Sequence, residues 1–322
     1  MLLAQNAAAA ETRPIIIAHR GASGYLPEHT LAAKALAYGQ DADFLEQDVV
    51  LTRDDQPIVL HDIHLDTVTN VAQAFPDRVR TDGRYYAIDL TLAEIRSLRV
   101  TERVDWRTGR PVFPGRFPAG KSDFRVPTLA EEIELIQGLN HSTGRSVGIY
   151  TEVKAPSWHR QQGKDISRIV VDVLRQYGYR EKSDAAFVQC FEPAETKRIR
   201  TELNCGLRLI QLIGGGAAEV DFERMRTPAG LAEIAQYADG IGPSLDHVVR
   251  GRDPNGQLIL SPLVADAHRC RLLVHPYTLR ADALPKYAAT FEELVRIFFV
   301  DAGVDGVFTD FPDRTLWARD EQ

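Results

Sequence analysis

Residues 14–38, PIIIAHRGASGYLPEHTLAAKALAY, contain one complete strand-then-helix unit. The apolar run Ile15–His19 has the length and composition of a buried strand. A polar loop follows, and Thr30–Tyr38 then places apolar side chains three to four residues apart, which is the period of an amphipathic helix. This unit is therefore the first candidate for a repeating β/α architecture.

The same strand-then-helix order recurs along the chain. Further strands are predicted at Phe44–Leu51, Val147–Val153, Ala185–Cys190, Gly206–Ile213, Gly240–Pro243, Arg271–His275 and Gly306–Thr309. Further helices are predicted at Leu129–Leu139, Ile166–Tyr177, Pro193–Leu203, Ala229–Tyr237, Leu260–Arg269, Phe291–Ala302 and Asp313–Ala318. Several strands are apolar from end to end, as in parallel strands that helices cover on both faces. Together these units predict a (β/α)8 barrel, in which the active site lies at the carboxyl ends of the strands.

One polar segment, from about residue 65 to residue 126, interrupts this rhythm after the second strand. Within it a short helix is predicted at Leu92–Leu98, because Thr91 and Glu94 have the spacing of a capping box. We therefore expect one barrel domain over residues 14–322, with this segment as an insertion. Residues 1–13 include MLLAQNAAAA, which is typical of the remnant of a secretion signal or of a disordered tail.

The composition excludes several classes of function. A chain of 322 residues with 44% hydrophobic residues can form a large core, and its net charge of −7 argues against a general nucleic-acid binder. No apolar run is long enough to cross a bilayer. The sequence has three cysteines, Cys190, Cys205 and Cys270, and their spacing matches no zinc-binding motif. Either all three are free thiols or two of them form one disulfide. Phosphate-loop and serine-esterase motifs do not occur in the sequence.

Acidic residues are predicted to gather at the mouth of the barrel. Glu46 and Asp48 lie two residues apart in a strand, so that their side chains share one face. Glu152 and Lys154 repeat this spacing in the next strand. Buried carboxylates are costly unless a cation neutralises them, and a set of oxygen ligands favours Ca²⁺ or Mg²⁺ over zinc. The alternatives are that Glu46 and Asp48 point outward, and that Glu152 forms only a local ion pair with Lys154.

Two histidines end apolar runs near these carboxylates. His19 ends the first strand and His61 follows the run PIVL, so we expect both near the tops of the first two strands. One imidazole can take a proton from a nucleophile while the other gives a proton to a leaving alkoxide. Arg20 and Lys154 then suit an anion clamp, although both residues also suit structural ion pairs. The residues alone predict a metal-assisted hydrolase of a phosphate ester, and the paired histidines favour a diester only modestly.

Seven segments together resemble the glycerophosphodiester phosphodiesterase family, and in particular its periplasmic bacterial type. They are AHRGASGYLPEHT, LEQDVVLTRDDQPIVLHD, TEVKAP, QCFEP, ADGIGP, VHPYTLR and GVFTDFPD. The match covers nearly the whole chain and extends into the insertion. The resemblance implies a (β/α)8 barrel with a small insertion after strand two. It also implies hydrolysis of glycerophosphodiesters, which are deacylated phospholipids, to sn-glycerol 3-phosphate and an alcohol.

The resemblance assigns the chemistry to five residues. It implies that Glu46, Asp48 and Glu152 bind one divalent metal ion, Ca²⁺ in the periplasmic type, with Mg²⁺ as the alternative. It implies that His19 and His61 are the acid–base pair.

The resemblance also suggests residues that contact the substrate. They are Arg20 and Lys154, close to the phosphate, Glu28 as a further polar residue of the site, and Phe191 and Tyr277, which can pack on the glycerol. Gln189 and Asp310 are candidates to line the mouth. For the residues beyond Arg20, Lys154 and Glu28, barrel packing is the alternative role. His29 is interpreted as a helix cap or as a support of the site rather than as a catalyst.

The expected partner is a small glycerophosphodiester, without nucleic acid and without stable membrane insertion. A homodimer is compatible with the sequence. The resemblance supports a periplasmic or secreted protein over a cytoplasmic one. Two alternatives stay open: a related barrel phospholipase that acts on intact lipid, and a non-catalytic barrel that binds glycerophosphodiesters.

Overall fold

The structure, a computed structural model, describes residues 13–214 and 220–321. The predicted signal remnant or tail at residues 1–13 therefore lies outside the described residues, except for Arg13. No helix of the described ranges is long and apolar enough to cross a membrane.

Parallel strands form the barrel, and each of the eight predicted strands is found near its expected place. They are β1 (Ile15–Ala18), β2 (Phe44–Leu51), β4 (Gly148–Val153), β5 (Ala186–Cys190), β6 (Arg208–Ile213), β7 (Gly240–Pro243), β10 (Leu273–Val274) and β11 (Gly306–Thr309). Their order in the sheet is β10-β7-β6-β5-β4-β2-β1-β11, so that the last strand pairs with the first.

The barrel closes between β10 and β11 through the segment that follows the short strand β10. The Phe308 N–H donates to the Pro276 carbonyl at 3.0 Å, and the Leu279 N–H donates to the Phe308 carbonyl at 2.8 Å. With this closure the predicted (β/α)8 fold is confirmed.

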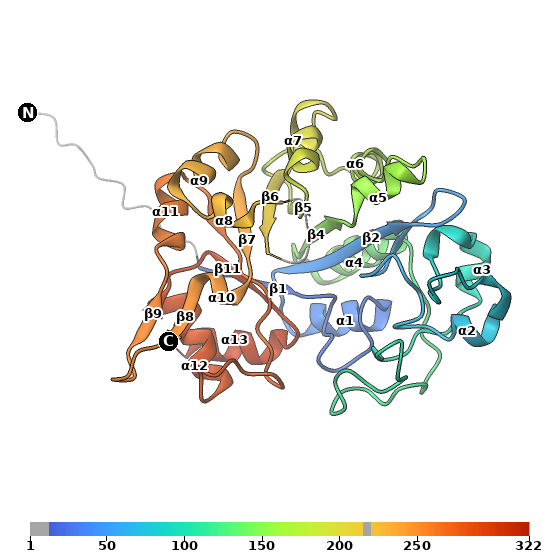
Figure 1. Cartoon of the computed structure of the whole chain (residues 1–322), viewed down its shortest axis with the longest axis horizontal. Helices are drawn as coiled ribbons and strands as arrows, with labels where there is room; N and C mark the ends of the chain where they lie inside the picture. Colours follow the sequence, from blue (N-terminus) through green and yellow to red (C-terminus); the bar gives the residue numbers. More distant parts are fainter. Residues whose placement is uncertain (1–12, 215–219, 322) are drawn as a thin grey trace, which may run out of the picture.

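Helices surround the sheet (Figure 1). The predicted ones correspond to α1 (Leu31–Gly39), α4 (Leu129–Thr143), α6 (Ile166–Gln176), α7 (Pro193–Thr201), α9 (Pro228–Ile234), α11 (Leu263–Arg269), α12 (Phe291–Arg296) and α13 (Pro312–Asp320). Three shorter helices lie between these elements. Helix α5 (Pro156–Gln161) lies between β4 and α6, α8 (Phe222–Met225) between β6 and α9, and α10 (Leu245–Val248) between β7 and β8 (Val249–Arg252). Hydroxyl caps fix several starts: the Thr30 side chain accepts from the Ala33 N–H, and Thr128 and Glu131 form a capping box.

Two helix predictions need correction. The predicted helix Leu260–Arg269 begins only at Leu263, because Leu258–Leu260 forms strand β9, which pairs antiparallel with β8 (Val249–Arg252). Pro262 then stands at the start of the helix, where a missing N–H costs nothing. The predicted helix Phe291–Ala302 is α-helical only to Arg296 and continues as a π-helical turn, Ile297–Asp301.

Aromatic residues fill the inside of the barrel and form the floor of its mouth. Tyr150 and Phe187 stack at 4.7 Å between ring centroids, and Phe308 meets Tyr150 edge-on at 5.0 Å. The Tyr150 hydroxyl lies 2.9 Å from His275 Nδ1, so that this buried hydroxyl has a partner. The larger apolar core lies between the sheet and the helices. Cys190, Cys205 and Cys270 are free thiols in the described structure.

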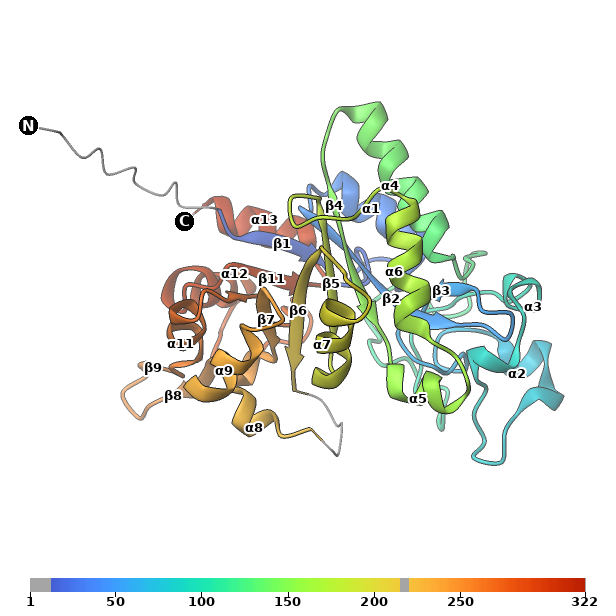
Figure 2. The same cartoon turned by 90° about the horizontal axis from the view of Figure 1, so that it is seen from above.

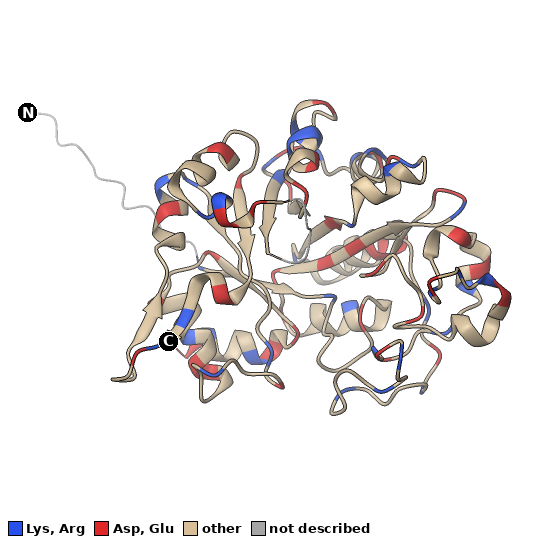
Figure 3. Ribbon diagram, in the orientation of Figure 1, with Lys and Arg blue, Asp and Glu red and all other residues tan. Residues whose placement is uncertain are grey.

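The insertion has its own small core beside β2 (Figures 1 and 2). It starts with β3 (Pro57–Val59), which runs antiparallel to β2, and continues with α2 (Val71–Ala74), the 3-10 turns Pro76–Arg78 and Ala87–Asp89, and α3 (Leu92–Arg96). The predicted capping box of Thr91 and Glu94 is present. Basic and acidic residues are interspersed along this part of the chain (Figure 3). Two of the basic residues, Arg103 and Arg116, reach the barrel mouth, as described below.

Candidate active site

A pocket of about 260 Å³ lies at the carboxyl ends of the barrel strands. Most residues that the sequence singled out line it: His19, Arg20, Glu46, Asp48, His61, Glu152, Lys154, Phe191, Tyr277 and Gln189. Leu212, Thr278, Arg280 and Phe308 complete the lining. Glu28 and Asp310 lie directly behind lining residues, since Glu28 pairs with Arg20 and Asp310 with His19.

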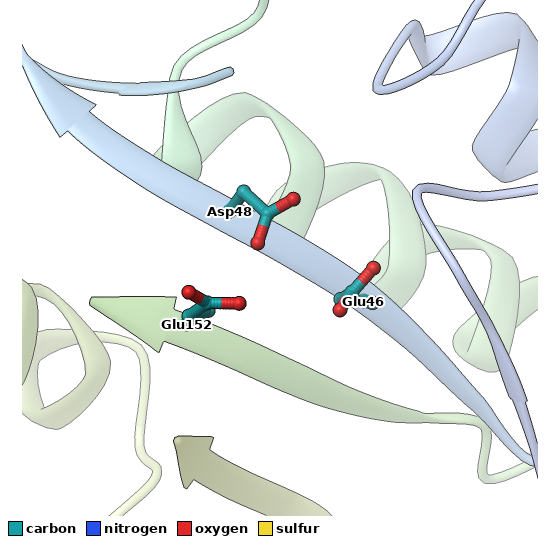
Figure 4. A group of neighbouring side chains, drawn as sticks. All are labelled: Glu46, Asp48 and Glu152. Atoms are coloured by element: carbon teal, nitrogen blue, oxygen red, sulfur yellow. The ribbon is translucent and has the colours of Figure 1, made fainter. Parts of the chain in front are cut away.

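The three predicted metal ligands converge in this pocket. Figure 4 shows the carboxylates of Glu46 and Asp48 on β2 and of Glu152 on β4 turned toward one space. One oxygen of each lies within 4.8 Å of the others, and the residues are only 3%, 1% and 5% exposed. Asp48 pairs in register with Glu152 across β2 and β4, which explains why the two side chains meet. The alternative that Glu46 and Asp48 point outward is wrong.

The charges of this carboxylate cluster are unbalanced. Burial raises the pKa of Glu46 well above its usual value, and the neighbouring Asp48 and Glu152 raise it further. Burial likewise raises the pKa of Glu152 to about 8, although Lys154 opposes the shift. Burial also acts on Asp48, but Lys154 and His29 outweigh it and hold the pKa of this carboxyl well below its usual value. A divalent cation would neutralise this repulsion.

Specific donors orient the cluster and leave one oxygen for a cation. The Arg20 N–H donates to Glu46 Oε2 at 2.8 Å, and Gln189 Nε2 donates to Glu46 Oε1 at 3.1 Å. His29 Nε2 donates to Asp48 Oδ2 at 2.7 Å. The second oxygen, Asp48 Oδ1, is buried without a hydrogen-bond donor among the described residues. An oxygen-rich set with one buried oxygen left over fits a hard cation such as Ca²⁺ or Mg²⁺.

The loop after β1 carries backbone strain where it meets the site. Arg20 and His29 have φ values of 60° and 59°, which non-glycine residues seldom adopt, and the His29 N–H donates to the Arg20 carbonyl at 2.9 Å. Gly21 has a φ of 85°, where a side chain would be strained. Gly24 is needed for space instead, since a Cβ there would lie 2.4 Å from the Phe311 ring. His29 is not the cap of α1, because Thr30 is, and it supports Asp48 instead.

Both predicted histidines are held by carboxylates through the same ring atom. His19 Nδ1 donates to Asp310 Oδ1 at 2.6 Å, and His61 Nδ1 donates to Asp62 Oδ1 at 2.7 Å. This geometry leaves the lone pair of each neutral ring on Nε2, and His19 Nε2 lies 4.0 Å from Glu46 Oε2. Each histidine–aspartate pair thus has the orientation of a general base or acid.

The position of His61 differs from the expectation. His61 does not stand at the top of the second barrel strand but follows β3, which returns along β2. The Leu60 N–H donates to the Asp48 carbonyl at 2.8 Å, which brings His61 beside the carboxylate cluster.

The pKa of each histidine lies well below its usual value. Burial lowers the pKa of His19 to about 4, and Arg20 adds to the shift while Asp310 opposes it. Burial, Arg20 and Lys154 lower the pKa of His61 to about 4, against the hydrogen bond with Asp62. At neutral pH both imidazoles are therefore neutral in the ligand-free protein.

Two arginines of the insertion complete the site, and the sequence did not point to them. Arg103 Nη1 donates to Asp62 Oδ2 at 2.7 Å, and Arg116 Nη2 donates to Asp310 Oδ2 at 2.7 Å. The insertion shows neither a strand nor a helix pattern around these residues, and no spacing in the sequence relates either arginine to its aspartate.

The predicted phosphate contacts fall into two groups. Arg20 and Lys154 line the pocket, and Lys154 Nζ also pairs with Glu152 Oε1 at 2.8 Å, so that the local ion pair is present as well. Glu28 has both oxygens occupied: Arg103 donates to them at 2.6 and 2.9 Å, and Arg20 donates at 3.0 Å. Glu28 is therefore placed to hold two arginines in position.

Phe191 and Tyr277 form one apolar wall of the pocket. Their rings meet edge-on at 5.9 Å between centroids, and Lys154 Nζ lies 5.9 Å from the centre of the Phe191 ring. The Tyr277 hydroxyl donates to the Ile213 carbonyl at 3.2 Å, which keeps the ring at the wall. A small carbon chain bound to a phosphate at Lys154 would face these rings.

Fold and site together define a class of protein: a (β/α)8 barrel enzyme with clustered carboxylates and two histidine–aspartate pairs at its mouth. The model of the glycerophosphoryl diester phosphodiesterase family matches residues 19–314. The chain belongs to this family, and we identify it as one of the family's enzymes.

Individual relatives support this assignment. The glycerophosphodiester phosphodiesterase of Haemophilus influenzae is 46% identical over 93% of this chain and 88% of the relative. The one from Treponema pallidum is 41% identical over 93% of this chain and 90% of the relative. A solved structure from Silicibacter pomeroyi aligns with a TM-score of 0.71 at 25% identity, over 97% of this chain and 95% of the other.

A further solved structure shares the fold. The Oleispira antarctica phosphodiesterase, in complex with the product sn-glycerol-3-phosphate, aligns with a TM-score of 0.63 at 21% identity, over 95% of this chain and 97% of that chain.

Proposed function

We propose that this protein hydrolyses glycerophosphodiesters to sn-glycerol 3-phosphate and an alcohol. The observation that carries the proposal is the meeting of three buried carboxylates with two histidine–aspartate pairs in one small pocket. The relatives that are 46% and 41% identical are named glycerophosphodiester phosphodiesterases, which supports this substrate class.

Glu46, Asp48 and Glu152 are the residues that would hold a divalent metal ion, with Ca²⁺ proposed and Mg²⁺ as the alternative. The buried Asp48 Oδ1, which has Lys154 Nζ at 3.8 Å but no hydrogen-bond donor among the described residues, supports this role. When bound, the ion would draw negative charge from the phosphate oxygens.

The proposed proton transfers belong to His19 and His61. Each Nδ1 is held by an aspartate, so each Nε2 can take or give the proton. One neutral imidazole would accept a proton from the attacking oxygen. The other would donate a proton to the alkoxide that leaves, and the negative charge of a bound phosphodiester favours the required imidazolium.

Arg20 and Lys154 would orient the phosphate, and Phe191 and Tyr277 would pack on the glycerol. A guanidinium and an ammonium at one side of the pocket suit the anionic oxygens, while the two rings offer an apolar wall. The volume of about 260 Å³ favours a deacylated substrate over an intact lipid with two acyl chains.

The test is the release of glycerol 3-phosphate from glycerophosphocholine with Ca²⁺ present, and its loss in EDTA. Restoration by Ca²⁺ but not by Mg²⁺ supports the proposed ion. Tight binding of glycerophosphocholine without product after long incubation would instead favour a non-catalytic barrel. Higher activity on micellar phospholipid than on glycerophosphocholine would favour a phospholipase.

The location and assembly are separate proposals. We propose a periplasmic or secreted protein, on the strength of the resemblance to the periplasmic type, and cell fractionation tests it. We also propose a homodimer, and sedimentation of the purified chain distinguishes it from a monomer.

A further inference from the structure

The two histidine–aspartate pairs are built in parallel from different parts of the chain. In each pair one aspartate oxygen accepts from the imidazole, and the second oxygen accepts from an arginine of the insertion. We infer that Arg103 and Arg116 are positioning residues, which fix both aspartates so that each histidine keeps its orientation. The inference rests on the proposed function of His19 and His61.

Arg103 holds the His61 side. Its Nη1 donates to Asp62 Oδ2 at 2.7 Å. Its Nε and Nη2 donate to the two carboxylate oxygens of Glu28 at 2.9 and 2.6 Å. The Thr67 hydroxyl, also from the insertion, donates to Asp62 Oδ2 at 3.1 Å. The planar guanidinium is thus held between two carboxylates, and its hydrogen bond to Oδ2 restricts the orientation of the Asp62 carboxylate.

Arg116 holds the His19 side. Its Nη2 donates to Asp310 Oδ2 at 2.7 Å, and its Nη1 donates to the Ser23 carbonyl at 3.2 Å. Asp282 accepts from its Nε at 2.8 Å, and the guanidinium lies 3.7 Å from the centre of the Phe113 ring. The barrel supplies a second donor here, because Arg280 Nε donates to Asp310 Oδ2 at 2.8 Å.

The two sides therefore differ in one respect that can be tested. Asp310 retains Arg280 if Arg116 is removed, whereas the described donors to Asp62 apart from Arg103 are only His61 and the Thr67 hydroxyl. Loss of Arg103 therefore leaves the Asp62 carboxylate with only these two hydrogen-bond donors to orient it.

A purely structural role is the competing explanation, in which the arginines only stabilise the folded insertion. Arg84 provides a matched control within the insertion. Its side chain is 15% exposed, as is that of Arg103, and it forms a bidentate pair with Asp66 at 2.7 and 2.9 Å. Arg84 and Asp66 both belong to the insertion, and Asp66 forms no hydrogen bond or ion pair with a histidine among the described residues, so Arg84→Ala removes an ion pair that stabilises the insertion without touching a histidine–aspartate pair.

The experiment compares the turnover of glycerophosphocholine by Arg103→Ala, Arg116→Ala and Arg84→Ala at saturating Ca²⁺. We expect kcat to fall about 10- to 100-fold for Arg103→Ala, less for Arg116→Ala and little for Arg84→Ala. Equal losses for Arg103→Ala and Arg84→Ala would overturn the inference.

A double-mutant cycle measures the coupling between Arg103 and Asp62, which a purely structural role of Arg103 would not produce. If Arg103 acts through Asp62, Arg103→Ala should cost less than about threefold in an Asp62→Asn background, where the carboxylate has already gone. The same cycle applies to Arg116 and Asp310. If the two substitutions instead lower kcat by independent factors that multiply, the arginines do not act through the aspartates.

Rescue keeps the test decisive if an alanine variant is unstable. Arg103→Lys retains the positive charge but not the planar arrangement of N–H donors, so it should keep part of the activity that Arg103→Ala loses. Dilute guanidinium should restore activity to Arg103→Ala but not to Asp62→Asn. Failure of both rescues in a folded variant counts against the inference. An inactive wild-type protein would instead refute the proposed function, which separates the two failures.

Discussion

His29 and Asp48 form a buried pair in which one imidazole decides how one carboxylate faces the pocket. His29 Nε2 donates to Asp48 Oδ2 at 2.7 Å, and Lys34 Nζ lies 3.3 Å from the opposite ring nitrogen. The lysine thereby fixes the tautomer in which Nε2 carries the proton. The Asp48 carboxylate is thereby held beside those of Glu46 and Glu152.

Replacement of His29 should weaken metal binding more than chemistry. We expect His29→Ala to lower the Ca²⁺ affinity about 10- to 100-fold, because Asp48 loses the donor that orients it. Turnover at saturating Ca²⁺ should recover most of its original value. The control is His268→Ala, which removes an exposed histidine paired with Asp305. Calorimetric Ca²⁺ titration measures both variants, and an unchanged affinity in His29→Ala would contradict the assigned role.

Metal affinity should rise with pH through about pH 8. Burial raises the pKa of Glu152 to about 8 in the metal-free protein, so this carboxyl holds a proton below that pH. Metal binding must displace the proton, and the apparent affinity therefore increases by up to roughly tenfold per pH unit for each proton released.

Calorimetry in buffers of different ionisation enthalpy measures this proton release directly. We expect proton release at pH 7 and less at pH 9, because Glu152 is then already ionised before the metal binds. Affinity that stays constant over this range would show that Glu152 is already ionised.

The two histidines should respond differently to the leaving group. We expect His19→Ala and His61→Ala each to lower the turnover of glycerophosphocholine by about 10²–10⁴-fold. An ester with p-nitrophenol as its alcohol needs no protonation on departure. The variant that lacks the general acid should therefore recover on that ester, whereas the variant that lacks the base should not.

Kinetics on both substrates thus assign acid and base. If either variant kept near-normal activity on glycerophosphocholine, that histidine would have no part in proton transfer.

Gly24→Ala should destabilise the protein although its backbone angles allow a side chain. The new methyl would lie 2.4 Å from the Phe311 ring, and relief of such overlap costs about 1–3 kcal/mol of unfolding free energy. Gly39→Ala is the control, since a Cβ there has open space and Gly39 ends helix α1. Denaturant unfolding should separate the two variants, and equal stabilities would show that Phe311 moves aside freely.

The parts of the site that follow from local patterns could be predicted from the sequence. Glu46 and Asp48 share a face because a strand alternates, and Glu152 meets them because β4 is the neighbour of β2 in a barrel. His19 could be placed because it directly follows β1.

The rest depends on contacts between distant segments. His61 was predicted beside a barrel strand, but the unpredicted antiparallel strand β3 positions it. Arg103 lies 41 residues from Asp62, and Arg116 lies 194 residues from Asp310. No periodicity in the sequence encodes such pairings, because they depend on how the insertion folds back over the barrel.

The pairing of the last strand with the first has a consequence for how the enzyme is made. His19 stands at the end of β1, whereas its partner Asp310 directly follows β11, 291 residues later. A chain that folds from its N-terminus therefore holds its carboxylate cluster before it holds this histidine–aspartate pair. If His19 has the proposed role, we expect a chain clipped before Asp310 to be inactive even where most of the barrel has formed.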